Sequence, residues 1–203
     1  MLCAPTGQAA KRMAMASGRE AITVHRMLGY NPETKEFAHH IDHTLPADLI
    51  VIDESSMLDL WLLHHLLRAV KDGTRLLFVG DVHQLPSVGA GHVLNDIIAS
   101  GIGYVAHLTQ IFRQGAGSCI VDNARAINCG MMPALDNKSD DFFMFNIRPD
   151  KIGKMIADIV AHRIPNSFGI PCEDIQVLSP MYKGNGGVDD INTRLQEQLN
   201  ADS

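Results

Sequence analysis

Asp53 and Glu54 directly follow an apolar run, in the stretch LIVIDESSML (49–58) of this 203-residue chain. A carboxylate at the carboxyl end of a buried parallel strand lies where open α/β sheets bind ligands. In nucleotide hydrolases the first acid of such a pair holds Mg²⁺, and the second orients or deprotonates the attacking water. The structural alternative is that both acids stabilise the amino-terminal end of a helix beginning near Ser56. On this pair alone, both interpretations stay open.

A second group of polar residues lies in GDVHQLPSVGAG (80–91), at the end of another apolar run. Gly80 and Asp81 end a predicted strand, and Gln84 follows three residues later. The amide of Gln84 is suited to bond a γ-phosphate or its attacking water, and to report the loss of that phosphate to the loop that follows. Glycine, aspartate and proline also favour a tight turn, and this interpretation is compatible with the first.

Two further residues carry weaker signals. Arg113 lies in LTQIFRQ (108–114) before a glycine-containing loop, where a guanidinium would spread γ-phosphate charge in a transition state. A surface salt bridge is the commoner use of such an arginine. Thr6, in APTGQAAKRM (4–13), would either cap the helix that follows it or donate to a nucleic-acid phosphate. Capping is the commoner use of such a threonine.

The elements that must position these residues alternate between strand and helix. Strands are predicted at 47–53, 75–81, 104–108, 141–147 and 174–180, and helices at 57–71, 91–100, 118–129, 150–163 and 187–199. This alternation predicts an α/β fold with a parallel sheet and flanking helices. The polar stretch 29–46 is predicted to be a loop or a small hairpin, and 133–140 a polar connection between units.

Composition limits the class of protein. The chain is 46% hydrophobic and 20% charged, so it can bury a core. It has no run of 18 apolar residues and no signal-peptide pattern at its amino terminus, which argues against a membrane protein. The four cysteines lack CxxC spacing, which favours reduced thiols in the cytoplasm. A net charge of −6 gives nucleic-acid binding no easy support, although a local basic groove would matter more than the total.

Four segments, in their order along the chain, closely resemble motifs Ia, II, III and IV of superfamily 1 DNA helicases of the RecD type. They are APTGQAAKRM, VIDESSML, GDVHQLPSVGAG and LTQIFRQ. The stretch ITVHRMLGY (22–30) is similar to the segment after motif Ia, and residues 174–200 are similar to part of the second RecA-like domain. The resemblance covers essentially the whole chain, and GDVHQLPSVGAG together with IFRQ is its most specific part.

The resemblance implies a RecA-like P-loop NTPase fold, with a partial first RecA-like domain at 1–112 and the first part of a second at 113–203. Residues 29–46 would form a small 1B-like insertion. ATP and Mg²⁺ would be the cofactors. The implied roles are metal coordination by Asp53, activation of water by Glu54, coupling of the γ-phosphate to DNA by Gln84, an arginine finger at Arg113, and DNA contacts by Thr6, His25 and Pro86.

The resemblance also implies a partner and a direction. Single-stranded DNA would be the partner, movement would run 5′→3′, and nuclease and helicase subunits of a RecBCD-like complex would be candidate neighbours. The phosphate loop G-x-x-x-x-G-K-[ST] does not occur in the 203 residues. We therefore expect a middle piece of a helicase, incomplete at both ends and unable to hydrolyse ATP alone. Apolar surface beside 49–52 and 75–79 is expected to cause self-association.

Two rival functions stay open. The first is a nucleotide hydrolase that acts on something other than DNA, against which APTGQAAKRM argues. Salt-dependent binding to single strands would separate it from a helicase. The second is a non-catalytic DNA-binding or scaffold domain that has kept the fold and lost the phosphate loop. A G-x-x-x-x-G-K-[ST] shortly upstream in the parent reading frame would favour the helicase.

Overall fold

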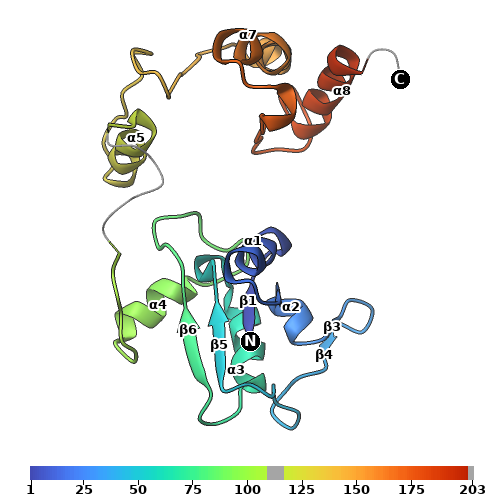
Figure 1. The fold of residues 1–203 in the computed structure, drawn as a ribbon, viewed down its shortest axis with the longest axis vertical. Coiled ribbons are helices and arrows are strands. Elements are labelled where there is room, and N and C mark those ends of the chain that lie inside the picture. The colour runs from blue at the N-terminus through green and yellow to red at the C-terminus, as the bar shows by residue number, and fades with distance from the viewer. Residues whose placement is uncertain (109–116, 201–203) are drawn as a thin grey trace. The chain divides into compact units, whose positions relative to one another are not determined.

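Residues 1–108 and 117–200 are described by the computed structural model of the chain. They belong to two compact units, Met1–Phe112 and Arg113–Ser203 (Figure 1). Among the described residues, no helix combines the length and the apolar character needed to cross a membrane.

The first unit is built on a parallel sheet of four strands. These are β1 (Leu2–Ala4), β2 (Ala21–Thr23), β5 (Leu49–Ile52) and β6 (Arg75–Phe78), in the order β2-β1-β5-β6. Cys3 pairs with Ile52 across β1 and β5, and Ile52 pairs with Phe78 across β5 and β6. The expected α/β class, with a parallel sheet and flanking helices, is confirmed. Because all four strands run in one direction, their carboxyl ends meet at one edge.

Local capping fixes where the helices of this unit begin and end. The helices are α1 (Gly7–Ser17), α2 (Val24–Met27), α3 (Leu60–Ala69) and α4 (Val93–Ser100), with a 3₁₀ turn at Ser55–Met57. The Asp59 carboxylate accepts a hydrogen bond from the Leu62 N–H at 2.7 Å and so starts α3. The predicted helix 57–71 is therefore shorter at both ends, and Gly73, with a φ of 87°, lies in the turn that leads to β6.

The core lies on one face of the sheet, under α2 and α3. Its fully buried members include Cys3, Ile50, Ile52, Leu28 and Leu66. Helix α1 packs against β1 and β2. Leu49 in β5 and Leu77 in β6 remain 44% and 49% exposed, although the apolar sequences of these strands predict burial on both faces.

Strand β6 is an edge of this sheet, whereas β5 has a neighbour on each side. The apolar surface expected beside 75–79 is thus exposed at Leu77 and Val79. The self-association that it was expected to cause stays a prediction.

The stretch predicted as a loop or small hairpin contains a hairpin. Its strands are β3 (Tyr30–Asn31) and β4 (Glu36–Phe37), with Tyr30 opposite Phe37. Gly29 sits at the base with a φ of 67°, and a methyl group there would come within 2.7 Å of the Ala38 Cβ. Only glycine combines that backbone conformation with so close an approach. Whether residues 29–46 act as a 1B-like insertion stays a prediction.

The second unit is helical over its described residues. Its elements are α5 (Cys119–Asn128), a 3₁₀ turn (Pro149–Lys151), α6 (Ile152–Asp158), a π-helical segment (Ile159–Arg163), α7 (Ile164–Phe168), a second 3₁₀ turn (Cys172–Asp174) and α8 (Val188–Leu199). The helices predicted at 118–129 and 187–199 are confirmed. The one predicted at 150–163 continues to Phe168 through the π-helical segment. Pro165 lies just after that segment and lacks the N–H that a regular α-helix needs.

The strands predicted at 104–108, 141–147 and 174–180 are wrong for the structure as described, since none of these residues is paired in a ladder there. Strand formation depends on a neighbouring strand, which an apolar sequence cannot supply for itself. At Met144 a side chain takes the place of that neighbour. Asn137 accepts from the Met144 N–H at 2.7 Å and donates to its carbonyl at 2.9 Å.

Two aspartates hold the described loops of the second unit to its helices. Asp141 accepts from the Ser118 hydroxyl at 2.7 Å and from the Cys119 N–H at 3.2 Å, at the start of α5. Asp190 accepts from the Gly186 N–H at 2.9 Å and from the Arg194 Nε at 2.7 Å. Both pKa values are lowered from 3.8, chiefly by the Ser118 hydroxyl for Asp141 and by the Gly186 N–H for Asp190.

We expect the second unit to lose stability in acid because of these two carboxylates. Each carboxyl group has a lower pKa in the folded chain than in the unfolded chain. Its contribution to stability is therefore complete at pH values above the unfolded pKa, and it is lost as the pH falls through the folded pKa. We would follow urea unfolding by circular dichroism at about pH 6 and at about pH 3. The urea concentration at the midpoint should fall less between these two pH values in the double variant Asp141→Asn, Asp190→Asn than in the wild-type chain. Asp72→Asn, in an exposed turn, is the control. An unchanged acid sensitivity in the double variant would contradict the assignment.

Candidate nucleotide and nucleic-acid site

The carboxyl ends of β1, β5 and β6 are joined by backbone hydrogen bonds. The Asp53 N–H donates to the Cys3 carbonyl at 2.9 Å, which ties the end of β5 to the end of β1. The Val79 N–H donates to the Ile52 carbonyl at 2.8 Å, which ties the end of β6 to that of β5. The residues that follow these strands therefore start from one edge of the sheet, where a parallel sheet binds its ligand.

Glu54 adopts a backbone conformation that few residues other than glycine adopt. Its φ is 50° and its ψ is 38°, in the left-handed region, at a cost of about 1–3 kcal/mol. The Asp53 carboxylate accepts from the Glu54 N–H at 2.9 Å. The Glu54 side chain makes no capping hydrogen bond, and Asp59 caps the helix that follows. Glu54 directly precedes the 3₁₀ turn Ser55–Met57, so the helix-start and the ligand interpretations of the acidic pair both stay open.

Ser55 is a structural member of this edge that the sequence reasoning missed. It is fully buried, and both its N–H and its hydroxyl donate to the Val79 carbonyl at 2.9 Å. A methyl group on Gly80 would lie 2.8 Å from the Ser55 hydroxyl and 3.0 Å from the Ser56 nitrogen. Glycine is thus required at position 80 by close approach. The only signal in the sequence was a small polar residue directly after the acidic pair.

The turn expected after β6 is present and leaves Gln84 exposed. The Asp81 carboxylate accepts from the His83 N–H at 2.9 Å, and the Asp81 carbonyl accepts from the Gln84 N–H at 3.2 Å. Ser87 donates to the Gly89 carbonyl at 2.9 Å further along the loop. Gln84 and Pro86 are both exposed. The turn and the ligand interpretations of this segment are therefore compatible in the structure.

Thr6 and His25 follow β1 and β2 at the same edge. The Thr6 hydroxyl oxygen accepts from the Ala9 N–H at 3.3 Å and caps α1, and its own hydrogen stays available to a phosphate. His25 is half-buried, with its ring centroid 5.4 Å from that of Tyr30. It has a packing role in addition to any contact with DNA.

Arg113 lies outside the described residues, so the structure places no arginine for the role expected of it. The other predicted site residues come from the carboxyl ends of four adjacent strands. Asp53 and Glu54 could hold Mg²⁺ there, because this ion typically takes one or two protein carboxylates and completes its shell with water and phosphate oxygens. Over residues 1–108 and 117–200, no cluster of three or more His, Cys, Asp or Glu side chains suits a metal ion.

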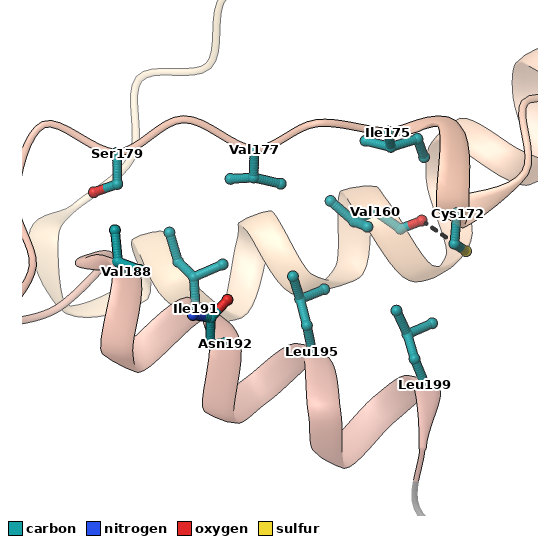
Figure 2. Close-up of a pocket in the computed structure, with 10 residues that line it drawn as sticks. All are labelled: Val160, Cys172, Ile175, Val177, Ser179, Val188, Ile191, Asn192, Leu195 and Leu199. Atoms are coloured by element: carbon teal, nitrogen blue, oxygen red, sulfur yellow. Dashed lines mark hydrogen bonds between the residues drawn. The ribbon is translucent and has the colours of Figure 1, made fainter. Parts of the chain in front are cut away.

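The second unit contains a cavity of about 220 Å³ between α8, the π-helical segment and the extended stretch 175–179. Figure 2 shows Val160, Val177 and Leu195 pointing into the space between these elements. The lining consists of Val160, Cys172, Ile175, Val177, Ser179, Val188, Ile191, Asn192, Leu195 and Leu199. It contains no charged side chain, so it is unsuited to a nucleotide phosphate.

Residues 1–143 match the family model described as an AAA domain. The chain belongs to this AAA domain family. Membership implies that the domain binds a nucleotide together with a metal ion. The matched residues include the whole sheet and every predicted site residue.

Two curated relatives of this AAA domain are a RecD2 helicase and a RecD subunit of the RecBCD enzyme. The chain is 40% identical over 199 residues to an ATP-dependent RecD2 DNA helicase of Deinococcus radiodurans, covering 98% of this chain and 26% of that protein. It is 44% identical over 133 residues to a RecBCD enzyme subunit RecD of Mycolicibacterium smegmatis, covering 56% of this chain and 24% of the relative. The resemblance to RecD-type helicases is confirmed. The chain spans about a quarter of the length of these relatives.

Among solved structures, a Pif1 helicase from Bacteroides matches with a TM-score of 0.41 and 20% identity. The match covers 96% of this chain and 45% of that one.

Proposed function

We propose that this AAA domain is a segment of an ATP-dependent 5′→3′ DNA helicase of the RecD type, acting in recombination and repair. The observation that carries the proposal is the joined edge of β5 and β6, where Asp53, Glu54 and the turn bearing Gln84 follow adjacent strands. The similarity over 98% of the chain to an ATP-dependent DNA helicase supports it. The direction of movement is taken from the RecD-type resemblance alone.

Each residue has a defined task in this proposal. Asp53 would hold Mg²⁺, which would supply positive charge at the phosphates of ATP. The Glu54 carboxylate takes the proton of the attacking water. Gln84 bonds the γ-phosphate or the water from the neighbouring turn. The loop from Pro86 to Gly91 then passes the loss of the phosphate to DNA.

DNA is proposed to pass near Thr6, His25 and Pro86 at the same edge. The hydroxyl hydrogen of Thr6 is free to donate to a backbone phosphate, which fixes the position of a strand without reading its sequence. Nuclease and helicase subunits are proposed as neighbours because several relatives are RecBCD subunits. The cytoplasm is the proposed location. The 203 residues contain no G-x-x-x-x-G-K-[ST], and in the proposed helicase the phosphate loop would lie outside them.

Replacing Gln84 by Ala tests the function. In the proposed helicase, we expect strand separation to fall further than DNA-stimulated ATP turnover, because the amide links the phosphate to the loop that contacts DNA. Both rates should be measured in parallel, with Gln198→Ala on the exposed face of α8 as the control. Equal losses in both rates would make Gln84 only another phosphate ligand.

The second candidate is a non-catalytic DNA-binding or scaffold domain. It is favoured by the missing phosphate-loop motif in the sequence. The same experiment separates the two candidates, because a scaffold binds single strands in a salt-dependent manner without any ATP turnover to lose.

A further inference from the structure

Trp61 belongs to a group of five aromatic rings that joins three elements of the first unit. The ring group consists of His25 from α2, Tyr30 and Phe37 from the hairpin, and Trp61 and His65 from α3. The Trp61 ring centroid is 6.2 Å from that of His25, 6.0 Å from Tyr30, 5.1 Å from Phe37 and 4.9 Å from His65. Aromatic pairs at these separations attract beyond their burial. Trp61 and Phe37 are each paired with every other member of the ring group, Trp61 from α3 and Phe37 from the hairpin. Trp61 is 46% exposed.

The hairpin is attached to the rest of the unit by these ring contacts and by backbone bonds at its base. Each of its strands has two residues, and a two-stranded hairpin by itself is marginally stable. Backbone bonds at its base run from the Ala38 N–H to the Gly29 carbonyl at 3.2 Å and from the His39 N–H to the Leu28 carbonyl at 3.0 Å. Tyr30 and Phe37 supply its aromatic contacts to α3, through Trp61 and His65.

The first turn of α3, which carries Trp61, is hydrogen-bonded to the loop that bears Gln84. The Leu60 N–H donates to the Ala90 carbonyl at 2.9 Å. A methyl group on Gly89 would lie 2.8 Å from the Asp59 Cβ and would overlap its carboxylate. Asp59, Leu60 and Trp61 are consecutive, and the cap from Asp59 to the Leu62 N–H holds them in one rigid helical turn. The loop 80–91 therefore contacts Asp59 and Leu60, and the other rings contact Trp61, the next residue of the same helical turn.

We propose that Trp61 is a positioning residue that couples the loop 80–91 to the β3–β4 hairpin. A shift of the loop displaces Asp59 and Leu60, the helical turn carries the displacement to Trp61, and the ring contacts turn the hairpin. If Gln84 senses the γ-phosphate, the hairpin then changes position when that phosphate is lost. This consequence rests on the proposed function. The backbone bond from Leu60 to Ala90 and the ring contacts of Trp61 form a continuous set of packed contacts that could carry such coupling.

The coupling can be tested without any nucleotide, because Trp61 is the single tryptophan of the chain. Gly89→Ala in this chain should push Asp59 away, raise the acrylamide quenching constant of Trp61 above its wild-type value and shift its emission to the red, starting from a ring that is 46% exposed. Gly103→Ala is the matched control, since a methyl group there meets nothing within 4 Å. Ser87→Ala removes the hydroxyl that donates to the Gly89 and Gly91 carbonyls, and it should shift Trp61 in the same direction by less. If Gly89→Ala and Ser87→Ala both fold and both keep the quenching constant and emission maximum of the wild-type chain, the proposal is overturned.

A second measurement separates coupling from simple packing. In the proposed helicase, Trp61→Ala should lower strand separation more than DNA-stimulated ATP turnover, and Trp61→Phe should restore most of the loss because it keeps an aromatic ring. Equal losses of both rates in Trp61→Ala, or no rescue by Phe, would overturn the positioning role. A wild-type protein without DNA-stimulated turnover would instead refute the proposed function, and the fluorescence of the Gly89 variant would still decide the coupling.

Discussion

Glu54→Gln is expected to lower ATP turnover by the proposed helicase by about 10²–10⁴-fold, the usual contribution of a general base. The amide is nearly the same size as the carboxylate but cannot take a proton from water at neutral pH. Nucleotide and Mg²⁺ binding should persist, because Asp53 remains at the end of β5 to hold the metal. The result would be a protein that binds ATP and retains it.

Steady-state hydrolysis and binding of a fluorescent ATP analogue would measure the two effects separately. Glu197→Gln, an exposed glutamate on α8, controls for the change in net charge. Turnover within a few-fold of wild type would remove Glu54 from the catalytic role. Loss of nucleotide binding together with turnover would instead make Glu54 a ligand of the metal.

Arg113→Ala is expected to lower turnover by roughly 10³-fold or more, which is the range seen for arginine fingers. The guanidinium acts on charge that develops in the transition state, so nucleotide binding should change little. The same pair of measurements applies. Arg125→Ala, on the exposed face of α5, provides a matched loss of one positive charge. A large fall in nucleotide affinity with little change in the maximal rate would assign Arg113 to ground-state binding instead.

Sequence patterns anticipated the parts of the fold that depend on neighbouring residues. The runs at 49–52 and 75–78 form strands, and the alternation with helices predicts a parallel sheet. Helix α8 begins directly after Gly187 as expected. These features follow from side-chain periodicity and local capping, which act within a few residues of the chain.

The same patterns failed where pairing was required. The segments 141–147 and 174–180 have the apolar composition of strands, yet they remain unpaired in the described structure. A ladder needs a second strand that local sequence does not specify. Asn137 shows how the chain satisfies Met144 without such a strand, through two hydrogen bonds from a single amide side chain.

By itself, the sequence determined which chemical groups the candidate site offers, because carboxylates after β5 and an amide after β6 are set by residue type and by position along the chain. It also determined the resemblance to RecD-type helicases, which the relatives confirm. Only the tertiary structure decided that Ser55 joins the two strand ends through the Val79 carbonyl, and that Trp61 lies between the hairpin and the loop 80–91. The physical reason is that these contacts join residues far apart in the chain. They form only when the parallel sheet brings the carboxyl ends of its strands to one edge.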